Sequence, residues 1–238
     1  MSAARTLPYS HDSALSDCGA VLFDVYGTLF DVAGAARALQ DQLGEKWQPL
    51  SDMWRRKQLE YTWLRSMMRR YTDFEAITAD ALDFALEVVQ IDDPKLREDL
   101  LALYMELPVY DEVPTVLQSL SENGIRLAVL SNGSPRMLES AIESAGLAEY
   151  MEAVLSVAEV GVFKPETITY RMACDHLHLP ISRMLFMSSN GWDIAGASSF
   201  GLTTIWVNRF NQPRERLPCG PARELKDLTT LPEILNLT

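Results

Sequence analysis

The sequence predicts an α/β fold, and three observations lead to it. Five short apolar runs have the character of buried strands: Ala20–Phe23, Arg126–Leu130, Ala153–Val157, Met184–Met187 and Thr203–Val207. Helical patterns separate the later runs, and strands that alternate with helices are typical of a parallel sheet with helices on both faces. The segment between the first two runs is far longer than an ordinary crossover. We therefore predict a Rossmann-like core and an inserted helical cap domain.

The helices of the predicted core are bounded by proline and glycine, the usual first-turn and stop residues of helices. The expected helices are Pro114–Ser121, stopped by Asn123-Gly124; Pro135 to Gly146; and one from Pro165 that ends before Pro180. In parallel sheets of this kind, chemistry gathers beyond the carboxyl ends of the strands. The residues that follow each strand are therefore the first candidates for a site.

The long segment from about Ala33 to Leu107 is almost wholly helical in pattern and rich in Trp, Tyr, Met and Arg. It leaves the sheet after the first strand and returns near Pro108, which places it over the strand ends. We predict a flexible tail at residues 1–17, a core at 18–32 and 109–238, and a cap at 33–108. The hinges between cap and core are expected near Phe30–Val32 and Pro108–Tyr110.

The composition indicates which classes of partner and which cellular compartment to expect. The 238 residues carry a net charge of −12, so a nucleic acid is an improbable ligand, because phosphate binding needs a basic surface. No apolar run reaches about 18 residues, and the first residues lack an apolar segment, so neither a membrane span nor a signal peptide is expected. Three cysteines without a CxxC pair fit a reducing, cytoplasmic compartment.

Polar turns follow the predicted strands. Asp24 ends the first strand, Ser131-Asn132-Gly133-Ser134 follows the second, Lys164 precedes Pro165, and Ser188 to Asp193 follow the fourth. A polar turn at a helix start offers backbone N–H groups to an anion. Each turn alone is better explained as a cap or a solvated loop. Together, at one edge of one sheet, they predict an active site.

These residues resemble a known family. DVYGTLFD, LSNGS, VFKP and SSNGWD resemble, in order, the four motifs of the haloacid dehalogenase (HAD) superfamily, and WRRKQLEYTWLRSMMRRY resembles the cap helix of its L-2-haloacid dehalogenase (type II) branch. The resemblance spans Val21 to Arg209. It implies the HAD fold and a hydrolase that converts small (S)-2-haloacids to (R)-2-hydroxy acids with inversion. It also implies a halide product, no cofactor and a homodimer.

Two departures from the phosphatases of this superfamily bear on the chemistry. Tyr26 stands where they carry the second Asp of an Asp-x-Asp motif, and tyrosine is not an acid near neutral pH. Ser188-Ser189-Asn190 replaces a turn in which they carry an acidic Mg²⁺ ligand. Magnesium prefers carboxylate oxygens. The sequence therefore favours a metal-free reaction.

The resemblance implies a mechanism. Asp24 attacks the carbon that bears the halogen and forms an ester. Lys164 keeps Asp24 ionised, since a nearby cation favours the carboxylate. Asp193 activates water, which attacks the Asp24 carbonyl, so the substrate carbon is inverted once.

Supporting roles follow from the same resemblance. Ser131 and nearby amides would hold the substrate carboxylate, and Tyr170 would hydrogen-bond within the catalytic network. The residues that would orient Asp24 and the water are Thr28, Ser188 and Asn190. The pocket around the alkyl group would comprise Tyr26, Leu59, Phe74, Asn132 and Trp192.

The resemblance also implies that Arg55 accepts the departing halide. Successive helix positions lie about 100° apart, so Arg55 and Arg56 cannot share one face. Arg56 has Glu60 at i+4 and is expected to form a surface ion pair. Arg55 has the apolar Leu59 at i+4, which places it toward the cleft.

Three alternatives stay open at this point. The chain could be a non-catalytic binding protein on the same fold, a HAD-type phosphohydrolase with an atypical metal site, or a dehalogenase that prefers haloacetate or fluoroacetate. The sequence leaves the preferred halogen, the chain length, the strictness of enantioselectivity, the oligomeric state and the role of Arg56 undecided.

Overall fold

The computed structural model describes residues 15 and 17–237. In this part of the chain, six parallel strands form one sheet in the order β3-β2-β1-β4-β5-β6. The strands are β1 Ala20–Phe23, β2 Arg126–Ser131, β3 Ala153–Ser156, β4 Met184–Ser188, β5 Thr203–Val207 and β6 Arg223–Leu225. The predicted tail lies mostly outside the described residues. Leu15, which is described, is buried in the core.

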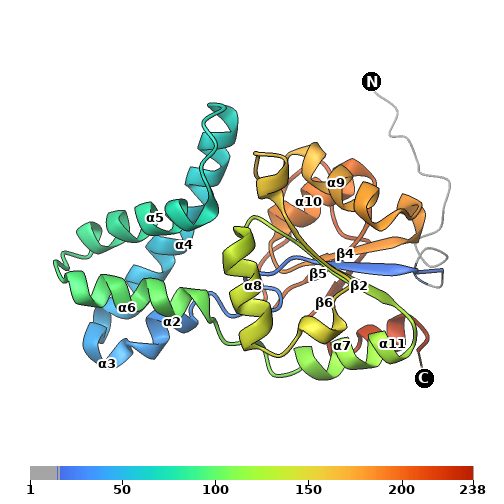
Figure 1. The fold of residues 1–238 in the computed structure, drawn as a ribbon, viewed down its shortest axis with the longest axis horizontal. Coiled ribbons are helices and arrows are strands. Elements are labelled where there is room, and N and C mark those ends of the chain that lie inside the picture. Colours follow the sequence, from blue (N-terminus) through green and yellow to red (C-terminus); the bar gives the residue numbers. More distant parts are fainter. Residues whose placement is uncertain (1–14, 16, 238) are drawn as a thin grey trace.

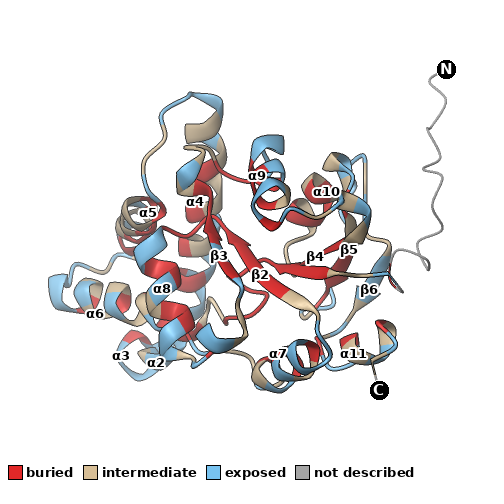
Figure 2. Ribbon diagram, turned by 45° about the vertical axis from the view of Figure 1, so that its right-hand side comes forward, coloured by how far each residue is buried: buried red, intermediate tan, exposed pale blue. Residues whose placement is uncertain are grey.

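The first strand lies at the centre of the sheet. Phe23 aligns with Val129 of β2 on one side and with Met187 of β4 on the other. All four residues of β1 are completely buried, and Figure 2 shows the central strands as buried along most of their length. Continuous apolar strands of this kind suit a parallel sheet covered on both faces. The strand order reverses at β1 and β4, where ligands bind in open α/β sheets.

Helices cover both faces of the sheet. Figure 1 places α9 and α10 on one side and α7 and α11 on the other. Their bounds, with that of α8, are α7 Val113–Glu122, α8 Pro135–Ser144, α9 Thr167–Leu177, α10 Gly191–Phe200 and α11 Leu231–Ile234. The predicted fold class is confirmed, and the five predicted strands are present to within one residue at each end.

A second group of helices, here called the cap helices, lies beyond one end of the sheet (Figure 1). They are α2 Gly34–Ala38, α3 Gln40–Leu43, α4 Trp47–Met67, α5 Phe74–Val88 and α6 Pro94–Met105. Asp73 caps α5 by accepting from Ala76 N (2.8 Å). Asp93 caps α6 and precedes Pro94 at its first position, as helix starts favour. No described helix has the length and apolar character needed to cross a membrane.

The chain leaves for the cap helices and returns from them through adjacent residues. Asp31 N donates to Pro108 O (2.8 Å), and Tyr110 N donates to Leu29 O (3.0 Å). A Cβ at Gly34 would lie 2.5 Å from Pro108 Cδ, so only glycine permits this close approach.

Aromatic side chains join the cap helices to the core. The ring pairs are Tyr26–Phe74 at 5.5 Å, Tyr26–Tyr104 at 5.7 Å, Trp63–Trp192 at 5.4 Å and Tyr71–Phe163 at 5.0 Å between centroids. Aromatic pairs at such distances stabilise beyond their buried area. In this structure the two groups of elements therefore share a packed boundary.

Two features of the core differ from the prediction. Strand β6 was not expected, because Arg223-Glu224-Leu225 contains no apolar run. The helix expected from Pro165 begins instead at Thr167. Glu166 N donates to Phe163 O (3.1 Å) and closes a turn over Lys164 and Pro165. These residues form the turn that directs the Lys164 side chain inward, so they are not available to the helix.

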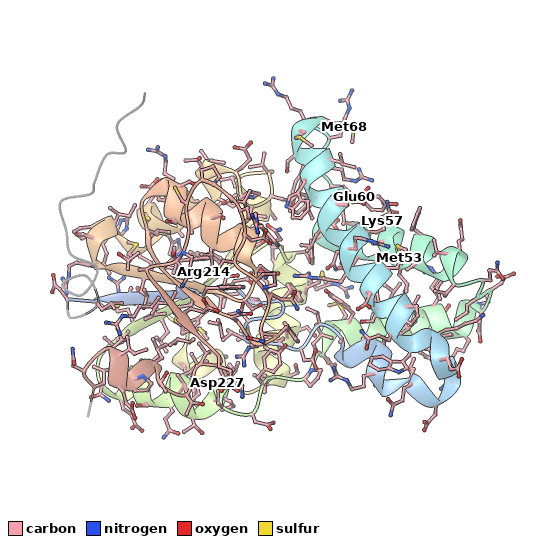
Figure 3. All side chains as sticks on the ribbon, turned by 180° about the vertical axis from the view of Figure 1, so that it is seen from behind. Met53, Lys57, Glu60, Met68, Arg214 and Asp227 are labelled. Atoms are coloured by element: carbon pink, nitrogen blue, oxygen red, sulfur yellow. The ribbon has the colours of Figure 1, made fainter. Side chains whose placement is uncertain are left out.

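The predicted ion pair between Arg56 and Glu60 is wrong. Glu60 forms its ion pair with Lys57 instead, with 2.9 Å between Lys57 Nζ and Glu60 Oε1. The exposed Arg56 contacts Met53 Sδ. Figure 3 shows Met53, Lys57 and Glu60 along α4. Positions three apart are neighbours on a helix just as positions four apart are. Lys57 is also held by the ring of Phe84, 4.6 Å from its ammonium.

Candidate active site

The two oxygens of Asp24 have different surroundings. Oδ2 accepts hydrogen bonds from Thr28 Oγ1 (2.9 Å), Ser188 Oγ (3.1 Å) and Asn190 Nδ2 (2.8 Å). Oδ1 accepts from Lys164 Nζ at 3.1 Å. Because Oδ2 is saturated by donors, Oδ1 is the oxygen with a lone pair available for attack.

A tight turn brings Thr28 back onto Asp24. Gly27 has φ of +90°, a backbone region that side chains disfavour. Thr28 Oγ1 accepts from Ser189 N (2.7 Å), which leaves its own hydrogen for Asp24. The turn after β1 is thereby bonded to the turn after β4.

Lys164 bridges the two acidic side chains. Its side chain is 1% exposed, and Nζ lies 3.1 Å from Asp24 Oδ1 and 2.9 Å from Asp193 Oδ2. Burial alone would lower the pKa of Lys164, but the charges of Asp193 and Asp24 outweigh burial and raise it. Lys164 is therefore a cation that remains charged in its buried position.

Asp193 is fully buried, and burial raises the pKa of its carboxyl to about 6, although the Lys164 charge opposes this shift. Tyr170 OH donates to Asp193 Oδ1 at 2.7 Å. Burial raises the pKa of Tyr170 well above its ordinary value, so the phenol stays a neutral donor. Asp193 is thus held from both sides and titrates in a range useful for a general base.

Arg55 reaches from α4 into the core. Its Nη2 lies 3.3 Å from both Tyr26 O and Asn190 Oδ1. Asn190 Nδ2 also donates to Asp24 Oδ2, so Asn190 connects Arg55 to the Asp24 carboxylate.

The turn after β2 lines another side of the site. Ser131 Oγ is buried and accepts from Gly133 N (3.1 Å), so its hydrogen is free to be donated. Asn132 Oδ1 accepts from Lys164 N (3.0 Å). A Cβ at Gly133 would lie 2.9 Å from Tyr26 Cε2, so glycine lets the turn approach Tyr26.

A family model for haloacid dehalogenase-like hydrolases matches residues 18–201. The chain belongs to this family. (S)-2-haloacid dehalogenase 1 of Pseudomonas sp. (strain CBS-3) is 40% identical over 91% of this hydrolase and 96% of that protein. L-2-haloacid dehalogenase from Xanthobacter autotrophicus, solved with chloropropionic acid covalently bound, superposes with a TM-score of 0.86 at 32% identity, over 92% of this chain and 98% of that one. A further dehalogenase structure reaches a TM-score of 0.90 at 36% identity, over 92% and 97%. The predicted family is confirmed.

The structure brings most of the predicted catalytic residues of this hydrolase into one hydrogen-bonded network. Its members are Asp24, Thr28, Arg55, Lys164, Tyr170, Ser188, Asn190 and Asp193. Ser131 and Asn132 lie at the end of the strand next to β1. The catalytic and binding roles of all these residues stay predictions.

Ring contacts join only some residues of the predicted apolar pocket. Tyr26 packs against Phe74 with tilted rings, and Trp192 packs edge-on against Trp63. Leu59 is half-buried one turn after Arg55 on α4. The Tyr26 hydroxyl and Trp192 Nε1 are buried without a hydrogen-bond partner among the described residues.

The donor set does not fit a magnesium ion. Lys164 Nζ lies between the carboxylates of Asp24 and Asp193, where its charge already offsets one of their two negative charges. Within the described residues, no cluster of three His, Cys, Asp or Glu side chains could hold a metal. Hard cations need several oxygen ligands and gain nothing from an ammonium between them.

One residue of the site was missed by sequence reasoning. Gln58 Oε1 accepts from Arg55 Nη1 (2.8 Å) and from Tyr104 OH (3.1 Å), and its amide donates to Thr78 Oγ1 (2.8 Å). Gln58 is completely buried and fixes the guanidinium of Arg55. Its position three residues after Arg55 was the available signal.

Proposed function

We propose that this hydrolase removes halide from small (S)-2-haloacids and releases (R)-2-hydroxy acids through a covalent ester on Asp24. The asymmetric environment of Asp24, with three donors on Oδ2 and Oδ1 left available, carries the proposal. The relatives named (S)-2-haloacid dehalogenase support this substrate class. The covalently bound chloropropionic acid in the Xanthobacter enzyme supports the ester.

In the first step, Asp24 Oδ1 attacks the carbon that bears the halogen from the side opposite the halogen. The C–O bond forms as the carbon–halogen bond breaks, and the halide leaves with the electron pair. The Arg55 guanidinium stabilises this charge as it develops. The Ser131 hydroxyl and the amides at the start of α8 hold the substrate carboxylate.

In the second step, water attacks Cγ of the ester while Asp193 accepts its proton. The charge that develops on Oδ2 meets the same three donors, which act as an oxyanion hole. The Cγ–Oδ1 bond then breaks, and the proton passes to the leaving alkoxide. The substrate carbon has been inverted once, because only the first step attacks it.

We also propose that no metal takes part. Halide is a good leaving group that needs solvation of its charge and no protonation, and Lys164 occupies the position between the acids. A metal-dependent phosphohydrolase would need a leaving-group acid where Tyr26 stands. The free thiols of Cys18, Cys174 and Cys219 support a reducing, cytoplasmic location.

Residues 33–108 are proposed to act as a cap that closes over the substrate, with residues 18–32 and 109–238 as the core. Closure would exclude bulk water from the ester. The chain segments that leave and re-enter the core are hydrogen-bonded to each other at Asp31 and Pro108, which supports hinges at these points.

A homodimer is proposed through the outer face of the cap helices. Exposed apolar side chains lie at the end of α4, with Met67 at 73% and Met68 at 60% exposure. Figure 3 shows Met68 at the end of α4 that points away from the sheet. The neighbouring hollow, of about 750 Å³, is lined by charges of both signs, namely Arg65, Arg70, Asp80, Asp83 and Glu87. Mixed charges suit a second copy related by a twofold axis.

The deciding experiment measures chloride release from racemic 2-chloropropanoate in EDTA, followed by chiral analysis. We expect release to stop near half, with the (R) substrate left and (R)-lactate formed. Asp24→Asn should release no chloride and serves as the matched control. In a single turnover in heavy-oxygen water, the label should enter Asp24 and not the lactate. Magnesium-dependent phosphate release from simple esters, without chloride release, would contradict the proposal.

A further inference from the structure

Arg209, just after β5, makes a set of contacts that the proposed mechanism does not use. Its Nε and Nη2 donate to Thr28 O at 3.2 and 2.8 Å. Nη2 also lies 2.7 Å from Glu112 Oε1, and the guanidinium lies 3.9 Å from the ring centroid of Tyr110. The Arg209 side chain is only 8% exposed.

These contacts fix the backbone of Thr28, whose side chain bonds Asp24. Arg209 binds the Thr28 carbonyl, and the Thr28 hydroxyl donates to Asp24 Oδ2 at 2.9 Å. Within the turn, Thr28 N donates to Val25 O (3.2 Å), but the Thr28 carbonyl itself is bound by Arg209. Arg209 adds this restraint with the planar fork of its guanidinium, which lysine cannot reproduce.

The same side chain reaches the segment that returns from the cap helices. Tyr110 ends the predicted hinge and Glu112 follows it, and Tyr110 N donates to Leu29 O. Glu112 balances the buried charge of Arg209. Arg209 thus joins the turn that carries Thr28 to the end of the returning connection.

We propose that Arg209 is a positioning residue, which acts through Thr28 to hold Asp24 Oδ2 in place for both steps of the reaction. The inference rests on the proposed function. Arg209 binds none of the groups assigned to the substrate or the halide, so its loss should change kcat and leave KM nearly unchanged.

The test compares Arg209→Ala and Arg209→Lys with Arg126→Ala. Arg126 is a matched control, because it also bonds a backbone carbonyl (Leu177 O, 3.0 Å) and a glutamate, Glu152. It begins β2, at the opposite end of that strand from Ser131. Rates are normalised to active sites, counted from the halide released in the first turnover.

Arg209→Ala should lower kcat per active site by roughly 10-fold to 100-fold, since a misplacement of about 1 Å can have an effect of that size. KM should stay within about 2-fold, and Arg209→Lys should restore part of the rate. Arg126→Ala should leave kcat per active site unchanged. Equal kcat in Arg209→Ala and the wild type, or an equal loss in Arg126→Ala, would overturn the assignment. If Arg209→Ala does not fold, Arg209→Lys carries the comparison.

Crystal structures give a readout independent of activity. In Arg209→Lys, the Thr28 Oγ1–Asp24 Oδ2 distance should lengthen beyond about 3.5 Å, the limit of a hydrogen bond. An unchanged distance would overturn the inference even if the rates fell. A wild-type enzyme that releases no halide would overturn the proposed function alone, and the structures would still decide the role of Arg209.

Discussion

At the scale of single residues, the site depends on a buried cluster of one cation and two acids. Asp24 and Asp193 share Lys164, so the two carboxylates carry one more charge than the ammonium balances. A buried cluster with this imbalance raises the affinity of one acid for a proton. Burial, to which the Asp24 charge adds, raises the pKa of Asp193 although Lys164 opposes the shift, and Asp24 accepts from three further donors.

The raised pKa of Asp193, about 6, predicts an acid limb in ester hydrolysis. Above this pH the carboxylate can take the proton of water, and below it the group is protonated, so the rate should fall about 10-fold per pH unit. At pH 5, halide should still be released in the first turnover while the ester accumulates. Mass spectrometry of the intact protein measures that accumulation.

Tyr170→Phe provides the control for this limb. Burial raises the pKa of Asp193, whereas the Lys164 charge and the Tyr170 hydrogen bond both lower it. Removing the hydroxyl should therefore move the limb to higher pH, with Lys164 and Asp24 still facing Asp193. A limb that stays in place in Tyr170→Phe would refute its assignment to Asp193.

At the scale of elements, the approach of α10 to the Lys164 turn depends on a small residue. A Cβ at Gly196 would lie 2.5 Å from Pro165 Cβ and 2.6 Å from Tyr170 OH. Gly196→Ala should therefore displace Tyr170 from Asp193 and lower kcat, by at least about 10-fold if the base shifts by 1 Å. Steady-state kinetics measure this effect.

A second glycine-to-alanine variant separates the local effect from a general one. A Cβ at Gly220 would meet no atom within 4 Å, so Gly220→Ala should leave kcat and the melting temperature unchanged. If Gly196→Ala retained full activity, α10 would have to move without disturbing Tyr170, and the packing argument would fail.

The elements also show what the sequence could predict. Asp24, Lys164 and Asp193 follow apolar strands or precede a helix, so local pattern and resemblance were enough to find them. Arg209 meets Thr28 across 181 residues, and Gln58 meets Tyr104 across 46. Contacts of that kind depend on tertiary packing, which local patterns do not record. The short β6 pairs with β5 through backbone groups that any residue supplies, so its sequence carries little signal.

At the scale of the whole molecule, the proposed dimer predicts a clear change in mass. Met67→Glu together with Met68→Glu would place two like charges on each side of the interface, and the repulsion would be doubled by symmetry. Light scattering should show a dimer for the wild type and a monomer for the variant. The control is Leu217→Glu, which changes an exposed apolar residue outside the cap helices. This variant should remain a dimer. A wild type that is already monomeric would contradict the interface.

The central position of β1 has a consequence during synthesis. This strand leaves the ribosome before any other described strand, yet its neighbours, β2 and β4, begin at Arg126 and Met184. At roughly 5–20 residues per second, the apolar Ala20–Phe23 waits on the order of 5–20 s for β2 and longer for β4. Nascent chains that stop within the cap helices would expose this strand, and they are expected to depend on chaperones until β4 emerges.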